Sequence, residues 1–151
     1  MEGRVVGSQH DRPLGMRADV PLTAQQAEAL RILQAYDLEP VRSRLLRQGL
    51  MPSTWIDEAI LEFRRYLGFR VLSDRVPAML SQPVDEVWHT CLLFSRIYAD
   101  LCQRVFGSFV HHEPATVPDP HPDDTWKAFV ETYRTTYGEP GRLWTMGHPP
   151  M

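Results

Sequence analysis

The residues best suited to chemistry lie in one stretch, 83–114, which holds both cysteines and three of the six histidines. Histidine, cysteine and carboxylate side chains are the usual ligands of borderline transition metals. Asp85 and His89 are four residues apart, so on a helix they share a face and the carboxylate can orient the imidazole. The spacing allows a metal site, but it is also typical of a polar stripe exposed to solvent.

His111 and His112 lie in a segment, SFVHHEPATVPDPHPDD, whose four prolines favour an extended chain. Adjacent side chains of an extended segment point to opposite sides, so only one of the two can face a given site. If one helix runs from His89 to Phe106, His112 reaches His89 only when the chain doubles straight back. A contact between His111 and Cys102 needs no such stretch.

Two interpretations of these residues remain open. The candidate metal ligands form a two-histidine, one-carboxylate set of the kind that non-haem iron favours, with zinc as the other metal; they are Asp85, His89, His111 and His112. Alternatively, the histidines hydrogen-bond the carbonyls of the proline-rich segment while an indole packs beneath, which would latch residues 108–122 or line a pocket. The residues of that binding set are Trp88, His89, His111, His112 and Cys102.

The elements that must position these residues are helices. Thr23 and Gln26 match a capping box, and Pro40 fits the first turn of a second helix that ends at Gly49. Ser53 caps a third helix, about 54–72, with apolar residues at steps of three and four. No segment shows the alternation of a strand.

The stretch 82–107 is expected to form the longest helix, with one apolar seam along its whole length. Cys91 and Cys102 would then lie roughly 16 Å apart on it, too far for a disulfide. A last helix follows the proline-rich segment, begins near Asp123 and stops at Gly138. Leu143 and Trp144 are expected to dock behind it.

These signals predict an all-α fold, an irregular bundle of four or five helices with a proline-rich extended segment before the last helix. Residues 1–20 are expected to be a loose arm, 21–145 a single domain and 146–151 a tail.

The composition excludes several classes of protein. With 151 residues, 43% of them hydrophobic, and a net charge of −3, the chain fits one domain without a cationic surface, so nucleic acid is not expected as a partner. No apolar run is long enough for a membrane span, and free thiols fit a cytoplasmic location. No HExxH, Cys-x-x-Cys or Gly-x-Ser-x-Gly motif occurs. Lys127 is the single lysine among sixteen basic residues, which indicates a GC-rich bacterial genome.

The run VDEVWHTCLLFSRIYADLCQRVFGSFVHHEP resembles small bacterial proteins related to the glycine-rich domain-containing protein family. Their pattern, D-x-x-W-H and then F-G-x-F-x-H-H-x-P, is matched here by Asp85, Trp88, His89, Phe106, Gly107, Phe109, His111, His112 and Pro114, with Tyr98 and Cys102 between. The likeness covers about residues 55–145. Many such relatives carry a second histidine where this chain has Cys91, and the glycine-rich tail is absent. The resemblance implies the fold and the choice of site residues.

The sequence therefore favours an accessory protein that binds a protein partner or a small ligand. The alternative is a metal-dependent enzyme with a two-histidine, one-carboxylate site. Oligomeric state is left open.

Overall fold

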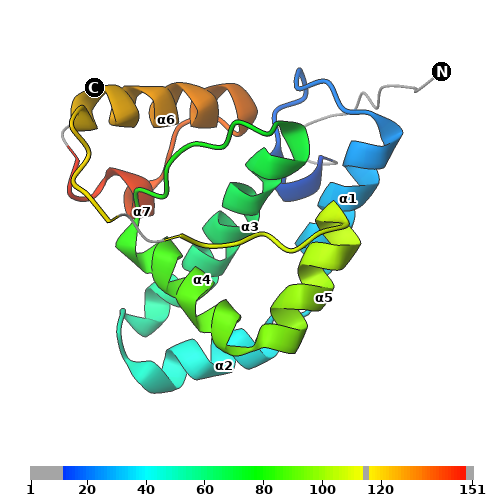
Figure 1. Cartoon of the computed structure of the whole chain (residues 1–151), viewed down its shortest axis with the longest axis vertical. Helices are drawn as coiled ribbons and strands as arrows, with labels where there is room; N and C mark the ends of the chain where they lie inside the picture. Colours follow the sequence, from blue (N-terminus) through cyan, green and yellow to red (C-terminus); the bar gives the residue numbers. More distant parts are fainter. Residues whose placement is uncertain (1–11, 114–115, 149–151) are drawn as a thin grey trace.

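The computed structural model describes residues 12–113 and 116–148, which form an irregular bundle of seven α-helices without a strand (Figure 1). The helices are α1 (Ala24–Ala35), α2 (Glu39–Gln48), α3 (Ile56–Leu72), α4 (Gln82–Leu93), α5 (Ser95–Phe106), α6 (Pro122–Thr136) and α7 (Arg142–Thr145). The predicted all-α class is confirmed. The helices outnumber the expected four or five because one expected helix is divided and α7 is a short addition.

Local signals place the first two helices as expected. The Thr23 hydroxyl accepts from the Gln26 N–H, and the Gln26 side chain accepts from the Thr23 N–H, which completes the capping box of α1. Pro40 lies in the first turn of α2, and Gly49 ends it with a positive φ of 66°. The predicted cap of the third helix is wrong: Ser53 belongs to a 3-10 turn, Ser53–Trp55, that leads directly into α3, and the N-cap of α3 is Trp55, without a side-chain hydrogen bond.

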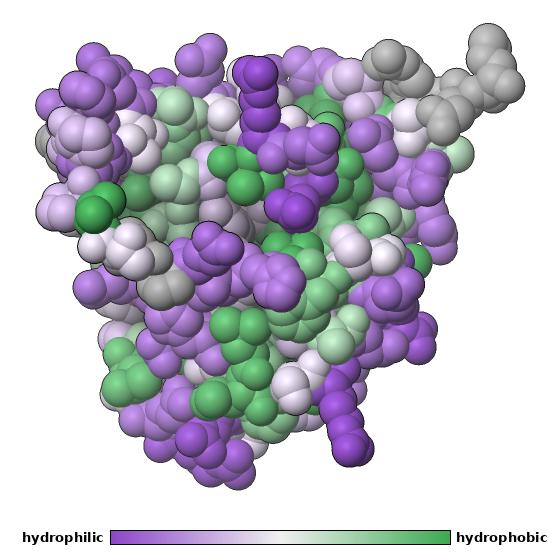
Figure 2. Space-filling model, viewed as in Figure 1, coloured by the Kyte–Doolittle hydropathy of each residue, from purple (hydrophilic) through white to green (hydrophobic). Residues whose placement is uncertain are grey.

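The prediction of one long helix over 82–107 is wrong, because the chain breaks at Phe94, whose φ of −95° and ψ of 66° are not helical. α4 and α5 have 12 residues each, so the 17-residue α3 is the longest helix described. The physical reason is packing: α4 lies against α3 and α5 against α1, and one straight helix could not reach both. On this face apolar surface gathers around the junction of α4 and α5 (Figure 2).

The break also removes the basis for the expected separation of the two cysteines. Cys91 and Cys102 are nevertheless both free and fully buried, on α4 and α5. Burial raises the pKa of the Cys91 thiol to about 12. The two thiols therefore belong to the core.

The expected loose arm is wrong for residues 12–20, while residues 1–11 lie outside the described part of the chain. Leu14 and Met16 are buried, and the Arg65 guanidinium on α3 donates to the Leu14 carbonyl at 2.8 Å. The Leu14 N–H donates to the Gln34 side chain at 2.5 Å. Residues around Leu14, although they lack helical spacing, thus pack on α1 and α3.

The C-terminal helices dock on a buried carboxylate of α3. Glu62 accepts from the Trp144 indole N–H at 2.7 Å, from the Tyr133 hydroxyl, and from Arg65 at 2.9 Å. Leu143 and Trp144 are buried, as expected. The predicted tail is also packed in its described part, since the His148 ring stacks on Trp126 at 4.2 Å. Among the described residues, no helix is long and apolar enough to cross a membrane.

Candidate metal centre

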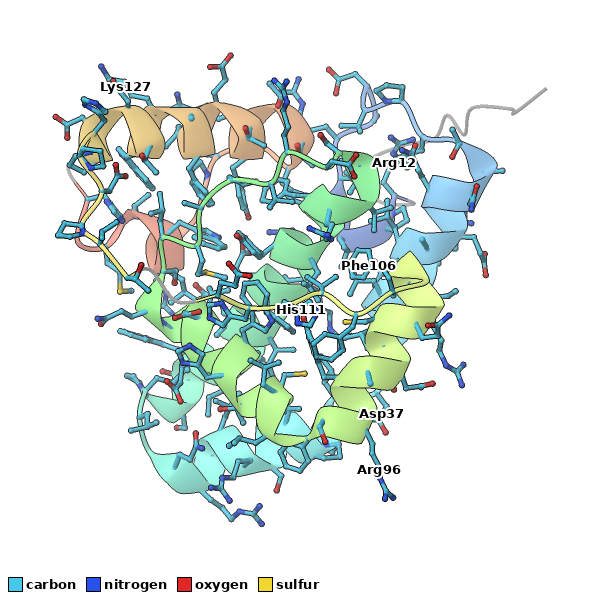
Figure 3. The ribbon with its side chains drawn as sticks, in the orientation of Figure 1. Arg12, Asp37, Arg96, Phe106, His111 and Lys127 are labelled. Atoms are coloured by element: carbon cyan, nitrogen blue, oxygen red, sulfur yellow. The ribbon has the colours of Figure 1, made fainter. Side chains whose placement is uncertain are left out.

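The segment after α5 runs extended across the bundle and is held by one buried hydroxyl. Gly107 ends α5 with a positive φ of 73°, and the following residues pass over α3 and α4, with His111 in the middle of this face (Figure 3). The Tyr98 hydroxyl donates to the Val110 carbonyl at 2.5 Å and accepts from the Trp88 indole N–H at 3.0 Å. This chain of hydrogen bonds fixes the segment to both α4 and α5.

Trp88 is the platform on which the segment places His112. The indole packs against Phe63 and Tyr66 of α3, with ring centroids 6.2 and 5.6 Å apart. The imidazole of His112 stacks on the indole at 4.1 Å, with the two planes 8° apart. Because Trp88 is buried and cannot turn, the His112 ring has a fixed plane and position.

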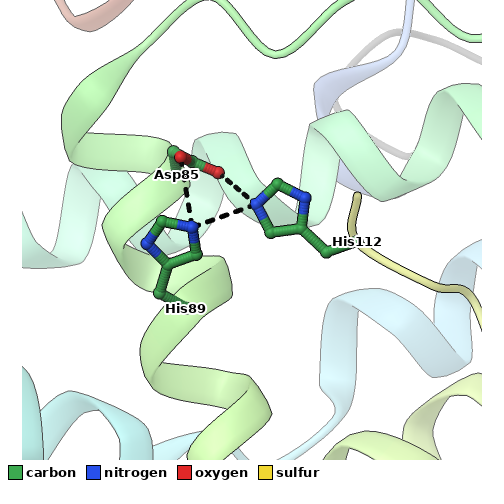
Figure 4. Close-up of side chains that lie close together, drawn as sticks. All are labelled: Asp85, His89 and His112. Atoms are coloured by element: carbon green, nitrogen blue, oxygen red, sulfur yellow. Dashed lines mark hydrogen bonds and ion pairs between the residues drawn. The ribbon is translucent and has the colours of Figure 1, made fainter. Parts of the chain in front are cut away.

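His112, on the extended segment, meets Asp85 and His89, which both project from α4 (Figure 4). Its Nε2 lies 2.7 Å from Asp85 Oδ1 and 3.1 Å from His89 Nε2, and His89 Nε2 lies 3.3 Å from Asp85 Oδ2. One ligand atom from each of the three residues lies within 4.8 Å of the others. The i,i+4 spacing puts Asp85 and His89 on one face, and the helix break lets the chain return within reach.

The separation of the two imidazole nitrogens has the length expected for neighbouring ligands of one ion. With bonds of about 2.1 Å, ligand atoms are about 3.0 Å apart at a right angle and about 3.4 Å apart at a tetrahedral angle. The observed 3.1 Å is closer to the first value. Two imidazoles and one carboxylate around such a point form the facial set that leaves other positions open.

The site is graded from a buried side to a solvent side. The side chain of His112 is 11% exposed, that of Asp85 30% and that of His89 49%. Glu86 Oε2 lies 3.8 Å from His89 Nδ1, the nitrogen that points away from the other two residues. A carboxylate near the second nitrogen of an imidazole ligand favours the tautomer whose Nε2 lone pair is free for a metal.

A cleft of about 490 Å³ adjoins the solvent side of the triad. Asp85, Glu86 and His89 form part of one wall, together with Gln82 and Pro83 of the first turn of α4. The other wall is largely apolar and comes from the connection between α2 and α3 and from the residue after α7; its members are Leu50, Met51, Pro52, Trp55 and Met146.

Burial sets the ionisation of the tyrosines around this centre. It raises the pKa of Tyr98 well above its ordinary value, so the hydroxyl that holds Val110 stays a donor. Burial, with the negative charge of Asp85, raises the pKa of Tyr66 to about 12. The Tyr66 hydroxyl donates to the Pro77 carbonyl at 2.6 Å. Both side chains are therefore neutral hydrogen-bond donors.

The structure brings together three of the four candidate metal ligands and leaves one out. His111 is exposed and contacts the Phe109 ring at 4.8 Å, which agrees with the expectation that only one of the adjacent histidines faces the site. Cys102, also a candidate, is in the core. Sequence reasoning missed the roles of Tyr98 and Glu86, although the motif contained Tyr98 and the i,i+3 spacing of Glu86 and His89 was a signal.

Comparison with known proteins adds a family. No curated protein and no solved structure matches the chain. A family model described as UCP032817-like matches residues 28–136, which include most of α1, all of α2 to α6, the extended segment and the whole Asp85, His89 and His112 triad. Since the match covers more than two thirds of the sequence, the chain belongs to the UCP032817-like family.

Proposed function

We propose that the protein is a metal-dependent enzyme that holds one divalent transition metal, iron or zinc, through Asp85, His89 and His112. The observation that carries the proposal is the 3.1 Å separation of the two Nε2 atoms beside the Asp85 carboxylate. Three good ligand atoms from two separate segments converge there, and one of the segments is held by contacts that fix its imidazole.

Hydrogen bonding alone does not pair these groups well. A neutral imidazole has one N–H, and the Nε2 of His112 faces both an acceptor oxygen and the other Nε2. If both Nε2 atoms carry protons, each can donate to its own Asp85 oxygen, but the two N–H groups then face each other 3.1 Å apart; if only the Nε2 of His112 does, its single proton has two acceptors within 3.1 Å. A cation at the point of convergence would satisfy all three ligands at once.

The chemistry such an ion supplies is the polarisation of a bound water or substrate oxygen. His112 and Asp85 would hold the ion on the side of the protein core. His89 and Glu86 border the cleft, so a molecule in the cleft reaches the open side of the triad. This asymmetry supports an enzyme more than a purely structural metal, whose ligands enclose it.

A second candidate function is the accessory binding protein, with the motif acting as a latch. The observation that favours it is the Trp88 to Tyr98 to Val110 chain of hydrogen bonds, which holds the extended segment without any ion. A protein partner would then bind the exposed surface of the extended segment after α5. The two candidates differ in what the histidines do, since a latch needs no metal.

The test is metal analysis of protein purified without a histidine tag and reconstituted anaerobically with Fe(II), or with Zn(II). We expect about one equivalent in the wild type and background levels in His89→Ala and His112→Ala. His111→Ala is the matched control, because it removes an adjacent, exposed histidine outside the triad, and it should keep full metal. Background metal in the wild type would reject the enzyme and leave the latch.

Two finer assignments are also proposals. The motif from Asp85 to Pro114 supports a bacterial protein related to the glycine-rich domain-containing proteins. The free thiols of Cys91 and Cys102 support a reducing compartment, hence the cytoplasm.

A further inference from the structure

The cleft beside the triad exposes apolar side chains that a surface without a ligand has little reason to present. Leu50 is 64% exposed and Met146 39% exposed, and both line the cleft. The Trp55 ring, which also lines the cleft, lies 5.6 Å from the guanidinium of Arg142, which is paired with Glu58 at 2.9 Å. The indole is therefore held in place, and the apolar wall is built rather than accidental.

The charges around the cleft restrict what can enter it. Asp85 and Glu86 are the acidic residues of its lining, and among the residues that the structure describes no arginine or lysine lines it. Since Arg142 beside Trp55 is paired with Glu58, an ion bound by the triad would be the single strong positive charge of the described lining, and it would be largely balanced by Asp85 and Glu86. A molecule with a free anionic body would gain nothing from the remaining wall, which is apolar.

We infer that this cleft takes the substrate of the proposed metal centre, and that the substrate is an uncharged organic molecule with an apolar body and one oxygen-bearing, metal-binding head. The inference rests on the proposed function. The head lies at the open side of the triad, next to His89, and the body lies against Leu50, Trp55 and Met146. A volume of about 490 Å³ is within the range of small-molecule sites.

Two hydroxamic acids with the same head and different bodies test this. Benzohydroxamic acid carries a ring and acetohydroxamic acid a methyl group, so the ratio of their affinities isolates the contribution of the apolar wall. For the zinc-loaded wild type, titration calorimetry should give a benzohydroxamate affinity about tenfold higher or more, because the ring is buried. Zinc content measured after each titration shows that the ion is retained.

The double variant Leu50→Ser with Met146→Ser removes the exposed wall without touching a triad residue. We expect zinc binding to be unchanged and the preference for the ring to fall to near twofold or less. Leu93→Ser is the matched control: Leu93 is 66% exposed, at the end of α4, and does not line the cleft. It should keep both the zinc and the preference.

The failures are distinguishable. Equal affinity of the zinc-loaded wild type for both acids, or an undiminished preference in the double variant, overturns the substrate assignment and leaves the metal centre standing. A wild type that does not retain zinc or iron overturns both. If the double variant changes only the apparent mass of the protein in solution, the apolar wall mediates contacts between copies of the protein. That result also overturns the inference.

Discussion

The rings of Trp88 and His112 lie parallel, 4.1 Å apart, so an ion bound to His112 would lie close to the indole. This contact joins a buried aromatic platform of α4 to the segment that returns after α5. It makes the tryptophan a reporter of whatever occupies the triad.

Addition of Cu(II), a paramagnetic quencher, should therefore lower tryptophan emission saturably, with about one equivalent. Trp88→Phe should lose most of the quenching while it still binds the ion, although more weakly, because the indole is no ligand but supports His112. Trp126→Phe, which removes an indole stacked on His148, is the control and should quench like the wild type. Full quenching in Trp88→Phe would place the ion elsewhere.

Thermal unfolding with and without a chelator separates a metal site from a latch. We expect the melting temperature of the metal-loaded wild type to fall on chelation, and that of His89→Ala to be lower and insensitive to the chelator. A latch gives another pattern: the variant loses about 1–3 kcal/mol and neither protein responds to the chelator. His111→Ala should follow the wild type in both conditions.

Tyr98→Phe should destabilise the fold by about 1–3 kcal/mol, since it leaves the Trp88 indole N–H and the Val110 carbonyl without their shared partner. It should also weaken metal binding by about tenfold or more, because His112 depends on the position of the same segment. Chemical denaturation and metal titration measure the two effects. Tyr36→Phe, whose hydroxyl bonds the exposed Asp100, should cost less; an equal cost would contradict the role of Tyr98.

Stability should fall in alkali through the buried tyrosines. Burial raises the pKa of Tyr66 to about 12 and raises those of Tyr133 and Tyr137 as well. In the unfolded chain a tyrosine ionises near pH 10, so above that value the folded state holds more protons and loses stability as pH rises. Below about pH 10 the contribution is complete. Unfolding midpoints that stay constant from about pH 9 to 12 would contradict this.

Local signals made the helix boundaries predictable. Thr23, Pro40 and Gly49 act on their own turns, so their positions in the sequence were sufficient. Phe94 carries no such signal, because it is neither proline nor glycine and the apolar seam passes through it without a change of spacing. The break there follows from which helices α4 and α5 pack against, and that is decided by the whole fold.

The same division applies to the candidate site. Asp85 and His89 could be paired from their spacing alone, since one helix holds both. The choice of His112 over His111 depends on the path of the extended segment, which the Tyr98 hydroxyl and the Trp88 ring determine. In the sequence Tyr98 appeared as one residue of the motif, and nothing in the motif indicated which hydrogen bonds its hydroxyl makes.

The contact between His89 and His112 closes a loop of chain, because the two residues are 23 positions apart and the whole of α5 lies between them. An ion that joins them would act as a crosslink. A link across a loop of this size reduces the entropy of the unfolded chain by an amount worth about 3 kcal/mol. In a protein whose two cysteines are free, a metal would thus do the work of a disulfide, and it would order α4, α5 and the returning segment as one unit during folding.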